Sequence, residues 1–225
     1  MNLPFTPEQF FDLFAQYNLA VWPMQLALYL LALAALFMAV KKNPYSDRTI
    51  ALILAFFWLW IGLVYHLFYF TRINPAAYLF AGLFIIQGSL FLAAGVWRQK
   101  LSFRFQPDLY SWVGAALILY GLLIYPLLGY FLGHRYPHSP TFGLPCPTTI
   151  FTFGLLLWTG PKVPKYLLAL PLVWTFIGFM AAFQLGVLED VMLPVAGLAA
   201  TALIWYRDRT ETGLAFPGSH QMQSR

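Results

Sequence analysis

The side chains that could do chemistry fall in three stretches of the sequence. One lies near the end of an apolar segment, one in a proline-rich stretch, and one at the end of a later apolar segment. The candidate ligand-binding residues are His66, His134, His138, Cys146, Gln184, Glu189 and Asp190. Imidazole, thiolate and carboxylate groups are the usual ligands of transition metals. A transition-metal cofactor is therefore one interpretation, with His66, His138 and Cys146 as its ligands.

Two other interpretations use the same residues. In one, these groups line a polar pocket that holds no metal. In the other, the loop residues are only solvated, His66 bonds a neighbouring helix, and Asp190 caps the helix that follows it. His134 and His138 would share one face of a helix, but the intervening Pro137 indicates an irregular loop. The sequence leaves all three interpretations open.

The familiar catalytic motifs are missing from the sequence. It contains no G-x-x-x-x-G-K-[ST] phosphate loop, no H-E-x-x-H zinc helix and no G-x-S-x-G nucleophile elbow. The apolar segments carry no Asp, Glu, Lys or Arg. A charge at the bilayer centre costs about 2.5–3.5 kcal/mol, so proteins retain one there mainly for function. These absences disfavour the commonest enzymes, proton-coupled pumps and voltage sensors.

The composition is that of a membrane protein. Hydrophobic residues make up 60% of the 225-residue chain and charged residues only 9%, whereas soluble domains are roughly 45–50% apolar and about 25% charged. A soluble fold with so few charges would lack the polar surface to stay dissolved, so we expect the lipid bilayer to be its main partner. The net charge of +5 is not accompanied by a basic, aromatic-rich cluster, which argues against nucleic acid.

The apolar segments predict an all-α fold, because a membrane-spanning helix needs about 20 apolar residues. We expect an integral membrane bundle of seven transmembrane helices, near residues 22–40, 49–70, 77–97, 109–132, 145–158, 166–187 and 191–206. Thr6, Pro7 and Gln9 predict the start of a short amphipathic helix over 7–17, lying in the membrane interface. Residues 1–206 should form a single domain, and 207–225 a disordered cytoplasmic tail.

The positive charges predict the orientation. All Lys and Arg residues except Arg72 and Arg135 fall in the loops on one side of the predicted bundle or in the tail. Because cytoplasmic loops collect Lys and Arg, we expect the N-terminus outside and the C-terminus in the cytoplasm. Five tryptophans fall at predicted helix ends, as an interfacial aromatic belt requires: Trp22, Trp97, Trp112, Trp158 and Trp205.

In this topology all the candidate residues face outward, and Cys146 has a distinctive setting among them. The segment 145–158 spans only about 21 Å at 1.5 Å per residue, short of the ~30 Å hydrocarbon core, and the sequence leaves open whether it spans fully or is re-entrant. Its N-terminus should be recessed, with Cys146 at the N-cap position. The thiol is then either a water-accessible, partly ionised group on the floor of an outward pocket, or an inert buried group that only packs.

Several stretches together resemble a known family. They are Leu3-Pro4-Phe5-Thr6, Tyr17-Asn18 with Trp22-Pro23, Tyr65-His66, Ile73-Asn74-Pro75-Ala76-Ala77, and Pro145-Cys146-Pro147-Thr148-Thr149 leading into 151–154. The resemblance covers nearly the whole chain, to about Tyr206, and its most distinctive part is the proline-cysteine-proline stretch. The family consists of bacterial multi-pass membrane proteins defined only as a domain of unknown function. It implies a bacterial inner membrane and assigns no activity, ligand or catalytic residue.

Three classes of function fit these observations. The first is a small transporter or ligand-binding membrane protein with an outward-facing polar site. The second is a membrane-embedded metal- or thiol-dependent enzyme, which the missing motifs disfavour. The third is a structural or sensory subunit that acts through a partner in a homo- or hetero-oligomer. Convergence of the outer polar residues would favour the first two classes over the third.

Overall fold

The computed structural model describes residues 3–160 and 162–214, and within these ranges it is helical with only isolated β-bridges. The predicted all-α class is therefore confirmed. Six helical runs are long and apolar enough to cross a membrane: Trp22–Val40, Ser46–Arg72, Ala77–Trp97, Leu109–Phe131, Tyr166–Leu185 and Leu188–Thr210. They match six of the seven predicted segments, with ends that differ by a few residues.

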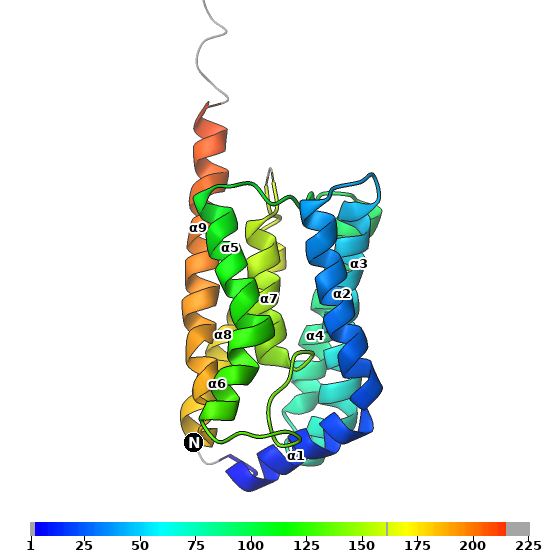
Figure 1. The fold of residues 1–225 in the computed structure, drawn as a ribbon, viewed down its shortest axis with the longest axis vertical. Coiled ribbons are helices and arrows are strands. Elements are labelled where there is room, and N and C mark those ends of the chain that lie inside the picture. The colour runs from blue at the N-terminus through cyan, green and yellow to red at the C-terminus, as the bar shows by residue number, and fades with distance from the viewer. Residues whose placement is uncertain (1–2, 161, 215–225) are drawn as a thin grey trace, which may run out of the picture.

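The elements follow one another along the chain in a bundle. They are α1 (Pro7–Ala20), α2 (Trp22–Val40), α3 (Ser46–Trp60) with η1 (Ile61–Tyr69) and η2 (Phe70–Arg72), α4 (Ala77–Phe91) with η3 (Leu92–Trp97), α5 (Leu109–Leu119) with η4 (Tyr120–Ile124) and α6 (Tyr125–Phe131), α7 (Pro145–Leu157), α8 (Tyr166–Leu185), η5 (Leu188–Val191) and α9 (Met192–Leu214). Figure 1 shows the long helices side by side, with α1 lying across one end of the bundle. We call this end of the bundle the α1 end. We call the opposite end, where α9 leaves the bundle, the basic end.

Helix α1 begins as the sequence predicts. The Thr6 hydroxyl accepts from the Gln9 backbone N–H at 3.3 Å, and the Gln9 side chain accepts from the Thr6 backbone N–H at 2.9 Å, a capping box that satisfies two otherwise unpaired donors. The buried face of the helix includes Phe10, Phe14 and Tyr17. This face packs on the bundle, so α1 covers part of the end that it crosses (Figure 1).

The predicted segment 145–158 is the 13-residue helix α7, which is too short to cross a bilayer alone. Every residue of α7 except Cys146 is buried, and the helix is enclosed by α3, α5, α8 and α9. Figure 1 shows the preceding loop rising into the bundle to meet its lower end. Irregular backbone at this depth is tolerated because protein covers it.

Glycines allow α5 and α7 to pack backbone against backbone. A Cβ on Gly114 would lie 2.7 Å from the Gly154 carbonyl oxygen, and a Cβ on Gly121 would lie 2.7 Å from the Pro147 carbonyl oxygen. Small residues at such a contact let membrane helices approach closely. The α5–α7 contact therefore fixes how deep α7 sits.

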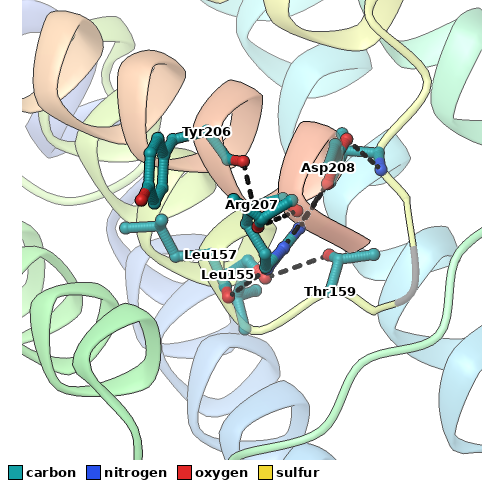
Figure 2. A network of polar contacts seen from close by, with 8 residues as sticks. Leu155, Leu157, Thr159, Tyr206, Arg207 and Asp208 are labelled. Atoms are coloured by element: carbon teal, nitrogen blue, oxygen red, sulfur yellow. Dashed lines mark hydrogen bonds and ion pairs between the residues drawn. The ribbon is translucent and has the colours of Figure 1, made fainter. Parts of the chain in front are cut away.

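The last helix continues past the predicted start of the disordered tail at residue 207. Helix α9 extends to Leu214, and Arg207 and Asp208 are buried in it, while 215–225 lie outside the described residues. Figure 2 shows why the helix does not end: Arg207 Nη1 donates to the Leu157 carbonyl at 3.1 Å, and its Nη2 lies 3.4 Å from the Asp208 carboxylate. The guanidinium thus caps the C-terminus of α7 and pairs with its own neighbour.

Four of the five tryptophans of the predicted belt are exposed. Trp22, Trp97 and Trp112 lie near helix ends, whereas Trp205 lies within α9. Trp158 is buried, because its indole N–H donates to the Ser111 carbonyl at 2.8 Å between α5 and α7. This residue belongs to the core rather than to the belt.

Candidate functional site

A cavity of about 330 Å³ opens at the α1 end. Its walls come from α1, η1, η2, α4, α6, the start of α7, α8 and η5. Most of the lining is apolar, and eight of its side chains are aromatic: Phe5, Phe10, Phe14, Tyr65, Phe70, Phe80, Tyr125 and Trp174. The other polar groups in the lining are His66, Asn74, Cys146, Gln184 and Asp190. An apolar cavity with a few convergent polar groups is the usual form of a small-molecule site.

His66 is fully buried in the wall of this cavity. It lies in η1, a π-helical continuation of α3, and such turns often occur at functional sites. Its ring packs against Phe84 at 4.7 Å and Trp174 at 5.3 Å between centroids. Neither ring nitrogen has a hydrogen-bond partner among the described residues. A buried polar group left unsatisfied costs about 1–3 kcal/mol, so the imidazole is available to a molecule that enters the cavity.

Asp190, in η5, also lines the cavity and is buried. The Tyr125 hydroxyl donates to its Oδ1, and the Cys146 thiol lies within hydrogen-bonding range of the same carboxylate. At the start of α9, the Met192 backbone N–H donates to the main-chain carbonyl of Asp190. The carboxyl group is held by side chains from α6 and α7.

Cys146 is the second residue of α7 and does not cap the helix. The N-cap is Leu144, because Pro145 takes the first helical position, which suits its missing N–H. The predicted N-cap assignment is therefore wrong by two residues. Gly178 of α8 makes room for the thiol, since a Cβ there would lie 3.3 Å from Sγ. The thiol is part of the cavity wall and only partly exposed.

Glu189, which is buried, pairs with the partly buried His134 outside the lining of the cavity. His134 Nδ1 lies 2.7 Å from Glu189 Oε1, and its ring stacks on Phe11 of α1 at 4.5 Å. Glu189 has no exposed surface, and its Oε2 has no partner in the described residues. Gly129 is required here, because a Cβ at that position would lie 2.5 Å from Oε1. Through its contacts with Phe11 and Glu189, His134 links α1 and the loop after α6 to η5.

His138 lies away from the cavity. It is half-exposed, and its Nε2 lies 3.4 Å from the carboxylate of Asp12, which is exposed on α1. In the part of the chain that the structure describes, no three His, Cys, Asp or Glu side chains are close enough together to hold a metal ion. The proposed metal set of His66, His138 and Cys146 is therefore not assembled.

The loop that carries His134 and His138 is anchored to the bundle by Asn18. Its side-chain NH₂ donates to the carbonyls of Pro137 at 2.6 Å and Ser139 at 2.8 Å. Its carbonyl oxygen accepts from Gln25 at 2.6 Å and from Thr141 at 3.0 Å. This buried network is fully connected, so it holds the loop in one conformation over the start of α7.

The structure thus separates the seven candidates into two groups. His66, Cys146, Gln184 and Asp190 line one cavity, whereas His134, Glu189 and His138 lie outside its lining. Sequence reasoning missed Tyr125 and Trp174. Each lies in an apolar run, where an aromatic residue is more often a packing residue, so no local signal marks it as part of a site.

Comparison with known proteins identifies the family. A family model described as a family of unknown function, DUF6064, matches residues 7–214. The chain belongs to this family, as the resemblance noted in its sequence implies. Neither a curated protein nor a solved structure matches the chain.

Proposed function

We propose that this member of the DUF6064 family is a ligand-binding protein of the bacterial inner membrane, and that its binding site is the cavity at the α1 end. The observation that carries the proposal is His66, a fully buried imidazole in the cavity wall with no partner on either nitrogen. Buried polar groups in proteins are satisfied in the large majority of cases. A cavity of about 330 Å³ beside this group has room for a small organic molecule.

The cavity faces the outside of the cell in this proposal. The described residues pass between the two ends of the bundle seven times, six times as long helices and once as the loop and α7 together, so α1 and the end of α9 lie at opposite ends (Figure 1). The loops and the helix end at the basic end carry Lys41, Lys42, Arg48, Arg98, Lys100, Arg104, Lys162, Lys165, Arg207 and Arg209. The α1 end carries only Arg72 and Arg135. This asymmetry supports a cytoplasmic basic end and an outward-facing cavity.

Binding suits the geometry better than covalent catalysis. A cysteine nucleophile needs a base within hydrogen-bonding reach, most often a histidine. Among the described residues His66 makes no hydrogen bond, and the thiol of Cys146 lies beside a carboxylate instead. The site therefore lacks the paired thiol and imidazole that thiol enzymes use.

The test uses 1-aminoanthracene, a small neutral dye whose fluorescence rises in apolar cavities, and the full chain in lipid nanodiscs. We expect saturable binding to one site. Ile177→Trp should abolish it, because Ile177 lines the cavity and the larger ring fills it. Val173→Trp is the matched control, because Val173 lies one turn earlier on α8 with its side chain exposed. Equal binding by all three proteins would contradict the proposal.

A further inference from the structure

We infer that the ligand of this cavity is a small organic cation, an ammonium group on an apolar body, with its charge beside Asp190. The inference rests on the proposed function and names the chemical class of its ligand. The cavity lining contains one carboxylate, Asp190, and no Lys or Arg. The lining therefore offers an acid and no cation, which favours a positively charged guest over an anionic one.

No cationic side chain is paired with Asp190 among the described residues. Its hydrogen-bonding neighbours, Tyr125 and Cys146, are neutral donors. Glu189, the adjacent residue, is a second buried carboxylate, and His134 is its one ion-pairing partner there. Buried charges in proteins are normally paired, because an isolated one is costly to desolvate. Ionisable groups at membrane depth are retained mainly for function.

The two arginines of the α1 end do not provide this compensation. Arg72 is exposed and stacks on the ring of Tyr69 at 4.8 Å. Arg135 is exposed and stacks on the ring of Tyr130 at 5.3 Å. Neither makes an ion pair with Asp190 or Glu189 in the described part of the chain. A cationic ligand would supply the missing charge.

The cavity walls fit the same class of molecule. Aromatic faces attract cations, and cages of aromatic rings are a common means of binding ammonium groups. Eight aromatic side chains line this cavity, and Trp174, the ring type that binds cations best, is among them. A neutral His66 imidazole can accept a hydrogen bond from the ammonium N–H. An anionic ligand would meet the Asp190 carboxylate and would find no cation in the lining.

The experiment measures how well three molecules of matched shape displace 1-aminoanthracene at neutral pH. They are N,N-dimethyl-4-phenylbutylamine, which is cationic, 5-phenylpentanol, which is neutral, and 5-phenylpentanoate, which is anionic. We expect the amine to displace the dye at a concentration at least tenfold lower than the alcohol needs, and the carboxylate to displace it least. If the dye binds saturably but the amine displaces it no better than the alcohol, the inferred cationic class of ligand is wrong, whereas the proposed binding site is retained. If the dye does not bind, the proposed function itself fails.

Asp190→Asn tests whether the Asp190 side chain binds the ammonium group. This change removes the charge and keeps an oxygen that can accept from Tyr125. We expect the amine to lose at least tenfold in affinity and the alcohol to be unaffected. Asp12→Asn, which removes an exposed acid at the same end, should leave both affinities unchanged. Unchanged amine affinity in Asp190→Asn would overturn the inference. If Asp190→Asn no longer binds the dye, the order in which the three molecules displace the dye from the unaltered chain decides whether the ligand is a cation.

Discussion

The chain places one buried aspartate near each end of its last spanning helix, and the two are held differently. At the basic end, Asp208 lies beside the guanidinium of Arg207 and accepts from the Val163 backbone N–H at 3.3 Å (Figure 2). At the α1 end, Asp190 is bound by a phenol and a thiol and borders a cavity. Cavities adjoin both acids, since Asp208 lines one of about 230 Å³ and Asp190 one of about 330 Å³. The difference is that Asp208 has a cation partner, whereas Asp190 is held by neutral donors.

The largest effect we expect concerns which end faces the cytoplasm. A green fluorescent protein fused to the C-terminus should be fluorescent, and an alkaline phosphatase fused at the same position should be inactive, because the basic end is retained inside the cell. The readout is all-or-none in bacterial cells. A dark, phosphatase-active pair would reverse the topology and place the cavity in the cytoplasm.

The next effect tests the ion pair at the basic end. Arg207→Met should lower the free energy of unfolding by about 3 kcal/mol, because a buried ion pair that loses one partner leaves the other charge uncompensated. The change also removes the donor to the Leu157 carbonyl at the end of α7. Equilibrium unfolding in mixed SDS micelles measures it, with the exposed Arg209→Met as control. Equal stability of the two variants would show that the network in Figure 2 does not contribute to the free energy of unfolding.

A smaller effect tests how closely Glu189 packs against Gly129 at the α1 end. Gly129→Ala should cost about 1–3 kcal/mol, because the added methyl group would overlap Glu189 Oε1. Gly82→Ala in α4 is the matched control, since nothing lies within 4 Å of its Cβ position. Alanine there should stabilise the helix by about 0.5–1 kcal/mol. If Gly129→Ala is as stable as Gly82→Ala, Glu189 is not held where the structure has it.

Local sequence patterns predict the two ends to different extents. The long apolar runs predict six helices with nearly the right bounds, because lipid exposure demands continuous apolar surface. The Arg207-Asp208-Arg209 run indicates the end of a helix, yet α9 continues because Arg207 and Asp208 compensate each other and Arg207 caps α7. The sequence around Glu189 and Asp190 is typical of a solvated loop. A local pattern cannot show that Tyr125, 65 residues away, binds Asp190.

The smallest effect compares the same substitution at the two acids. Asp208→Asn should destabilise the protein by about 1–3 kcal/mol, because the buried guanidinium of Arg207 loses its carboxylate. Asp190→Asn should change stability by less than about 1 kcal/mol. Its amide oxygen can still accept from Tyr125, and removing a buried charge that lacks a cation removes a desolvation cost. Unfolding in mixed SDS micelles without added ligand measures both. A large loss in Asp190→Asn would mean that the charge itself holds α6, α7 and η5 together. Asp190 would then be a structural anchor like Asp208, and the contrast between the two ends would disappear.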